Sequence, residues 1–63
     1  MKVGDLVVQD LEGLGVVTTD PYVYKSMGGY AYDVVLVSFF QNGDTFEVDC
    51  DELKVISEAR RSS

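Results

Sequence analysis

The sequence predicts an all-β fold, a small barrel of five strands. Three observations predict it: the apolar residues fall in short β-branched runs, no segment has a helical period, and turn residues separate the runs. The chain has 63 residues, which is enough for one domain, and 46% of them are hydrophobic, as expected of a chain that folds. We expect the barrel to occupy residues 1–57 and the mostly polar residues 58–63 to form a disordered tail.

The N-terminal third contains two predicted strands. Residues 3–9 are largely apolar and β-branched, which favours a first strand. Residues 11–15 hold two glycines around one leucine, a pattern typical of a turn followed by a bulge or a close backbone approach. A second strand is expected over residues 16–19. It ends before Pro21, which cannot donate to a strand ladder.

The middle of the chain combines an irregular segment with the central strand. Residues 20–30 have no helical period and carry the Gly28-Gly29 pair, so they predict a long loop or a loose, irregular hairpin. The strand at 31–40 follows. Its stretch 34–40 is apolar at both parities, which indicates a strand that is covered on both faces.

The C-terminal part predicts a hairpin and a short closing strand. Asn42-Gly43 between two apolar runs predicts a type I′ turn, in which both central residues need positive φ. Residues 45–51 alternate, so one face is expected to be buried and the other wet. The buried face would carry Phe46, Val48 and Cys50, and the wet face Glu47, Asp49 and Asp51. Residues 51–54 suit one 3₁₀ turn, and residues 55–56 a final short strand.

The charge balance bears on the kind of partner. Eleven acidic residues against five basic ones give a net charge of −6, which repels phosphate backbones. Direct binding of duplex nucleic acid is therefore disfavoured, and base stacking on aromatic side chains is the weaker nucleic-acid alternative. A neutral or basic protein partner suits this charge better.

Cysteine usage and hydropathy bear on the compartment. Cys50 is the only cysteine, so no internal disulfide can form, and small secreted domains usually have several. No apolar run is long enough to span a bilayer, and the N-terminus has no signal-peptide core. We therefore expect a cytoplasmic protein, in the host cytoplasm if it is viral, that does not contact membranes.

Catalysis is not expected. The chain has no histidine, the commonest general base, and Cys50 falls on the predicted buried face, where its thiol is inert. Asp49 and Asp51 could stand as a carboxylate pair, but a convex wet strand offers no cleft. The acidic residues do not have the spacing of a calcium-binding loop. The prediction is a non-enzymatic protein without cofactor or metal.

The binding residues are predicted from aromatic and acidic side chains. Four tyrosines lie in or beside the 20–30 segment, and tyrosine is enriched at protein interfaces because it joins an apolar ring to a hydroxyl. The alternative is that they pack as cross-strand pairs over a thin core. The predicted partner-binding set is Tyr22, Tyr24, Tyr30, Tyr32, Glu47, Asp49 and Asp51.

Two family resemblances rest on short motifs spread over nearly the whole chain. Lys2-Val3-Gly4-Asp5-Leu6-Val7-Val8, Gly13-Leu14-Gly15-Val16-Val17 and Leu53-Lys54-Val55-Ile56-Ser57 resemble the small SH3-like barrel proteins of tailed bacteriophages. The first two motifs, with a later acidic strand, also resemble the Tudor-like RNA-polymerase-interacting domain of CarD-type regulators. These 63 residues contain no counterpart of the basic helical domain with which those regulators contact DNA. The resemblance implies an SH3-like or Tudor-like barrel.

These observations lead to one leading functional hypothesis and two alternatives. The leading one is a phage-encoded protein-interaction module that binds a host or virion protein through its tyrosine loop and acidic face. One alternative is a transcription-associated module that docks on RNA polymerase. The other is a self-associating structural barrel, because small barrels expose strand edges and residues 34–40 are apolar on both faces.

Overall fold

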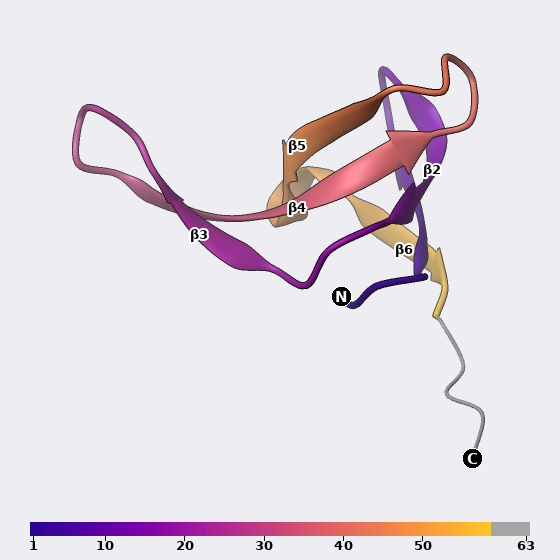
Figure 1. Ribbon diagram of the computed structural model, residues 1–63, viewed down its shortest axis with the longest axis horizontal. Helices are drawn as coiled ribbons and strands as arrows, with labels where there is room; N and C mark the ends of the chain where they lie inside the picture. Colours follow the sequence, from indigo (N-terminus) through magenta and orange to yellow (C-terminus); the bar gives the residue numbers. More distant parts are fainter. Residues whose placement is uncertain (59–63) are drawn as a thin grey trace.

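In the computed structural model, six strands and one 3₁₀ turn follow one another along residues 1–58, which are the residues described (Figure 1). The elements are β1 (Leu6–Gln9), β2 (Gly13–Val17), β3 (Tyr22–Lys25), β4 (Ala31–Phe39), β5 (Thr45–Asp49), η1 (Cys50–Glu52) and β6 (Lys54–Ser57). The all-β prediction is confirmed. The predicted disordered tail falls outside the described residues except for Glu58.

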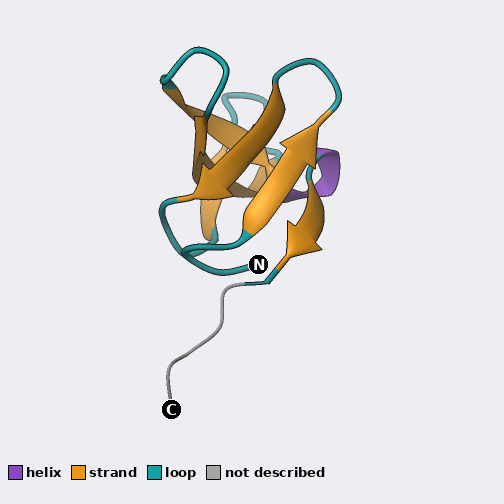
Figure 2. Ribbon diagram, turned by 90° about the vertical axis from the view of Figure 1, so that its right-hand side faces the viewer, coloured by secondary structure: helices purple, strands orange, loops and turns teal. Residues whose placement is uncertain are grey.

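The strands form one antiparallel sheet that curls into a half-barrel. Its order is β3-β4-β2-β1-β6, and β5 pairs with the other edge of β4. The curl itself runs β5-β4-β2-β1-β6. The short η1 turn connects β5 to β6, so the strands at the two ends of this curl follow one another in the chain (Figure 2). Every strand pair is antiparallel.

β4 is the central strand, and at nine residues it is the longest. Along one edge it pairs with β2, where Val17 lies opposite Val37, and then with β3, where Tyr22 lies opposite Val34. The link between β2 and β3 continues the ladder. The backbone N–H of Thr18 donates to the carbonyl of Leu36 (2.8 Å), and the N–H of Leu36 donates to Oγ1 of Thr19 (3.1 Å).

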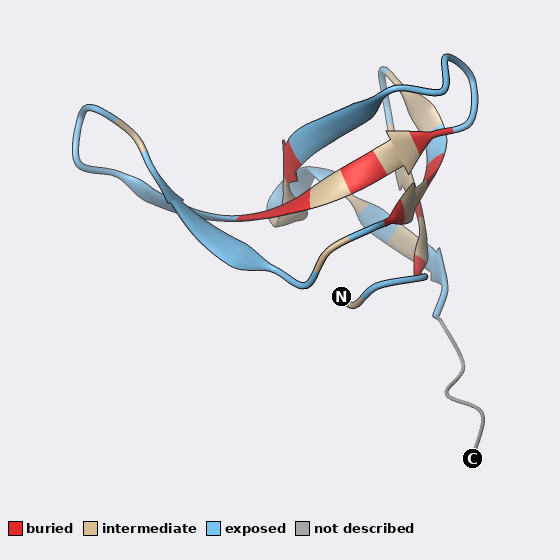
Figure 3. Cartoon of the chain, viewed as in Figure 1, coloured by how far each residue is buried: buried red, intermediate tan, exposed pale blue. Residues whose placement is uncertain are grey.

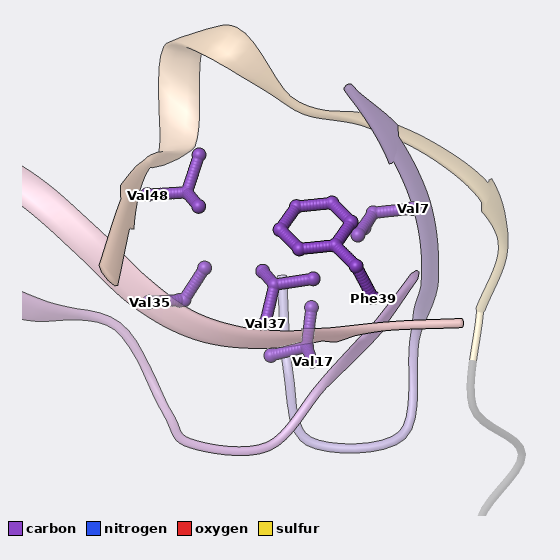
Figure 4. Packing of buried hydrophobic residues seen from close by; sticks show 6 residues of the cluster. All are labelled: Val7, Val17, Val35, Val37, Phe39 and Val48. Atoms are coloured by element: carbon purple, nitrogen blue, oxygen red, sulfur yellow. The ribbon is translucent and has the colours of Figure 1, made fainter. Parts of the chain in front are cut away.

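The core lies inside the curl and consists of small apolar side chains around one ring. It contains Val7, Val17, Val35, Val37, Phe39 and Val48 (Figure 4), with Cys50, Leu53 and Val55 packed against it. The alternation predicted for β5 is confirmed at Val48, which is buried. Phe46 points to the same side of the sheet but is 42% exposed, because it lies at the rim, tilted against Phe39 with ring centroids 6.1 Å apart.

Both N-terminal strands have different bounds from those predicted. β1 begins at Leu6 instead of Val3, because Gly4 has φ +91° and the Asp5 N–H donates to the Lys2 carbonyl (3.1 Å), which closes a turn. The buried Asp5 carboxylate accepts from the Lys2 N–H (2.9 Å) and pairs with its ammonium group (3.4 Å). β2 covers Gly13–Val17 instead of 16–19, so the two-glycine segment is itself part of the ladder.

The sixth strand lies in the segment predicted as a loop or loose hairpin. The hairpin alternative is correct: β3 pairs with β4 from Tyr22 opposite Val34 to Lys25 opposite Ala31. The ladder extends to the tip, where the Ser26 N–H donates to the Tyr30 carbonyl (2.8 Å) and Gly29 takes φ +85°. The predicted count of five strands is therefore one too low.

The β4–β5 hairpin is confirmed, but its turn is not type I′. Residues 40–44 connect the strands, and Gly43 is the only one of them with positive φ (+73°). Asn42 keeps a negative φ because its side-chain Oδ1 accepts from the Asp44 N–H (3.1 Å), a local turn of its own. The Gly43 N–H then reaches the Phe39 carbonyl (2.9 Å).

Candidate functional site

The β3–β4 hairpin projects from the half-barrel as a two-stranded ribbon (Figure 1). Among residues 22–33 all are exposed except Ser26, which is half-buried (Figure 3). The ribbon therefore has both faces in solvent. A two-stranded ribbon is only marginally stable in water by itself. Contacts with a binding partner would therefore stabilise this part of the fold more than any other.

All four tyrosines lie on one face of this hairpin. Tyr24 is paired with Tyr32, and Tyr22 lies two residues before Tyr24 on the same strand. Tyr30 lies two residues before Tyr32, opposite Ser26. Because successive side chains alternate between faces and paired residues share a face, the four rings project together. Their exposed fractions run from 38% for Tyr22 to 68% for Tyr30. We call this surface the tyrosine face.

The tyrosine face continues onto the outer face of the half-barrel, opposite the core. Val34 follows Tyr32 on that face and lies in one row between Tyr22 and Asp49. It is only 5% exposed although it points away from the core. The Tyr22 hydroxyl donates to the carboxylate of Glu47, so its ring extends across this row. The tyrosines thus combine the packing and the surface alternatives. The ring of Tyr22 extends over the row that contains Val34, while the tyrosine face as a whole remains exposed.

The electrostatic environment of Tyr22 differs from that of an isolated tyrosine. Its hydrogen bond to Glu47 raises the pKa of the phenol, and partial desolvation and the negative charge of the same carboxylate raise it further. The hydroxyl therefore stays protonated and continues to donate. The bond fixes the ring of Tyr22 against β5.

Of the three predicted acidic residues, two join this surface. Glu47 is paired with Leu36 and Asp49 with Val34, so both carboxylates project from the outer face. Asp49 also has a local role, because its Oδ1 accepts from the Asp51 N–H (3.0 Å) and caps η1. Asp51 does not continue the strand as predicted. β5 ends at Asp49, and the η1 turn carries Asp51 away from the strand face.

Cys50 lies at the start of η1 and packs against the core cluster, half-buried. Burial raises the pKa of its thiol, and the carboxylates of Asp33 and Asp49 raise it further. A thiol in this state is a poor nucleophile at neutral pH. This placement agrees with the prediction that the cysteine faces the core side.

A shallow hollow that the sequence did not reveal lies between the β1–β2 turn and η1. It has a volume of about 430 Å³ and is lined by Gln9, Asp10, Leu11, Asp51 and Glu52. The turn is held by the Gln9 side chain, whose Oε1 accepts from the N–H groups of Leu11 (3.1 Å) and Glu12 (2.8 Å). Sequence patterns do not show that Asp10 and Asp51 line the same hollow, because only the curl of the sheet brings the two turns together.

Residues 1–58 contain no group of three or more histidine, cysteine, aspartate or glutamate side chains placed to hold a metal ion. Within the same residues, no helix has the length and apolar character needed to cross a membrane. Comparison of the chain with protein-family models, with curated proteins and with solved structures finds no match.

Proposed function

We propose that this chain is an SH3-like barrel that works as a protein-interaction module without catalytic activity. The strand order β6-β1-β2-β4-β5, with a 3₁₀ turn before the last strand, supports the barrel assignment. The β3 segment is then an enlargement of one connection of that barrel. Functional sites are commonly located on such enlarged connections of a rigid scaffold.

One observation carries the functional proposal: four tyrosines project together from the hairpin and adjoin the carboxylates of Glu47 and Asp49. Tyrosine is enriched at the energetically important centres of interfaces, and it loses little conformational entropy on binding. A patch of this kind, exposed on a small chain, indicates recognition of another macromolecule.

The chemistry of the surface favours a protein segment that carries arginine or lysine. A guanidinium group can stack on the face of a tyrosine ring while a neighbouring carboxylate neutralises it. The net charge of −6 attracts basic partners and repels nucleic acid. The resemblance to tailed-phage barrels makes a host or virion protein the proposed partner.

The test compares two variants that each remove exposed aromatic groups. Tyr24→Thr with Tyr32→Thr removes the centre of the tyrosine face while keeping β-forming residues. Phe40→Ser removes an aromatic residue that is 58% exposed and lies just beyond the far end of β4, and it serves as the matched control. Wild type, variant and control are tagged and used to capture proteins from a bacterial lysate, with and without phage infection.

The proposal expects one stoichiometric protein that is captured by the wild type and the Phe40 control and is lost from the double tyrosine variant. The captured protein is then purified and its affinity for all three chains measured by calorimetry. Equal affinity for the wild type and the double tyrosine variant, with both folded by circular dichroism, would rule out the tyrosine face as the site.

A further inference from the structure

The hairpin leaves one strand edge open. Along β3, Tyr22, Tyr24 and Ser26 direct their backbone groups toward β4, as the Ser26 N–H to Tyr30 carbonyl bond shows. In an antiparallel ladder the intervening residues direct theirs the opposite way. The N–H and C=O groups of Val23 and Lys25 therefore point outward, and no strand within residues 1–58 pairs with β3 on that side.

This edge lacks most of the features that usually prevent strand pairing. Within β3 there is no proline, and its register with β4 runs without a bulge. Its apolar residue Val23 is 58% exposed. Natural sheets protect such edges with proline, bulges or charged side chains. Within β3 the charge of Lys25 is the one such feature.

The distribution of charge indicates what kind of strand can pair with this open edge of β3. All eleven acidic residues lie outside positions 21–32, which is the longest acid-free stretch of the chain and includes all of β3. Because the net charge is −6, two copies repel each other overall, and they repel least where the acid-free part of these ribbons projects (Figure 1). The opposite edge of the ribbon is less suitable for self-pairing, because its outward backbone groups belong to Ala31 and Asp33 and it adjoins acidic β5.

We infer that two copies of this chain associate by antiparallel pairing of their β3 strands. A two-fold axis at Tyr24 places Val23 opposite Lys25 of the second copy, and the outward groups of these residues form four backbone hydrogen bonds. The two copies of Tyr24 then face each other. The tyrosine faces of both chains join into one aromatic surface.

The pairing also brings opposite charges together on the other face of the ribbon. Asp33 is paired with Val23 in its own chain, so Asp33, Val23 and Lys25 of the second copy form one row across three strands. Strands lie about 4.8 Å apart, so a lysine side chain can extend across Val23 to the aspartate. The two-fold axis generates this contact twice. A four-residue strand pair is below the usual size of a stable interface, and we expect weak association in the high micromolar range.

The test uses two variants with one reversed charge each. Each variant alone should dimerise poorly, and a mixture of the two should form a heterodimer. Lys25→Glu places like charges at both contacts of its own homodimer, and so does Asp33→Lys. In a mixture of the two variants, both contacts join opposite charges. Each chain still carries its own like-charged pair within the hairpin, so recovery in the mixture cannot come from a repaired hairpin.

Sedimentation equilibrium from micromolar to millimolar concentration is expected to show wild-type dimers, weaker homodimers of each variant, and a heterodimer about tenfold tighter than either homodimer. Amide exchange should slow at Val23 and Lys25 as the wild-type concentration rises. A monomeric wild type at millimolar concentration would overturn the inference. A mixture that associates no better than its components, or slowed exchange at Ala31 and Asp33 instead, would do the same.

Discussion

The Tyr22 hydroxyl donates a hydrogen bond to the Glu47 carboxylate, which ties the projecting hairpin to β5 across the outer face of β4. The two residues are 25 positions apart in the chain. The bond holds one ring of the tyrosine face in place and covers the row that contains Val34. It also connects the aromatic and acidic parts of the proposed binding surface.

This bond should be visible in an alkaline titration. The pKa of Tyr22 is raised above the ordinary tyrosine value of 10.0, with the hydrogen bond to Glu47 as the main cause. A raised folded-state pKa means that the bond's contribution to stability is complete below pH 10.0 and is lost as pH rises through the raised value.

We expect Tyr22→Phe to remove one component that titrates above 10.0 from the phenolate absorbance. Tyr24→Phe is the control, since no hydrogen bond to its hydroxyl is found within residues 1–58. An unchanged alkaline end of the curve in Tyr22→Phe would contradict the assignment.

Two substitutions at Asp49 should distinguish its role as the cap of η1 from the role of its negative charge. Its Oδ1 accepts from the Asp51 N–H and caps η1, a function that asparagine can also perform. Asp49→Ala should lower the free energy of unfolding by about 1 kcal/mol, whereas Asp49→Asn should cost a few tenths at most. Urea denaturation measures both. If the two variants were equally destabilised, the cap would not be the reason.

Much of the architecture could be predicted because local patterns determine it. The apolar run at 34–40 becomes β4, and the alternation around Val48 places that residue in the core. The sequence leaves β3 open between a loop and a loose hairpin, because its residues are exposed on both faces and show neither a buried run nor a clean alternation. Tyr22–Lys25 forms a strand through its hairpin pairing with β4, and the burial pattern of these four residues alone does not show that pairing.

The residue types of the proposed binding surface can be predicted from the sequence, but their arrangement cannot. Four tyrosines in one segment indicated an aromatic surface, yet only the register of Tyr24 with Tyr32 shows that the rings share a face. The alternation predicts Asp51 on the acidic strand face, but β5 ends two residues earlier, at Asp49. The cap formed by Asp49 ends the strand there and starts η1.

Cys50 should react slowly with thiol reagents. Burial and the nearby carboxylates raise the pKa of the thiol, so less thiolate is present at neutral pH. We expect alkylation by iodoacetamide to be several-fold slower in the folded chain than in urea, after correction for the effect of urea on a cysteine peptide. The rate should keep rising with pH beyond the ordinary cysteine value before it levels off, because the pKa of this thiol is raised. Equal corrected rates in the folded and unfolded chain would show that the thiol is neither shielded nor shifted.

Gly15 should be the glycine least tolerant of a side chain. It is buried in β2 opposite Phe39, and a Cβ added there would lie 2.6 Å from Cγ1 of Val37 and 2.9 Å from the Ser38 carbonyl oxygen. The neighbouring backbone cannot move without disturbing the β2–β4 ladder, so we expect Gly15→Ala to cost about 3 kcal/mol, the upper end for overpacking a core. Such a loss is a large fraction of the stability of so small a domain.

The matched control is Gly28→Ala at the hairpin tip, where the nearest atom to an added Cβ is Cδ2 of Tyr30 at 3.4 Å. Gly28 does not have positive φ, so alanine fits its backbone conformation, and the change in stability should stay within about 0.5 kcal/mol. Thermal and urea unfolding of both variants test the contrast. A Gly15→Ala chain as stable as Gly28→Ala would mean that β2 and β4 do not approach as closely as the register of Gly15 with Phe39 requires.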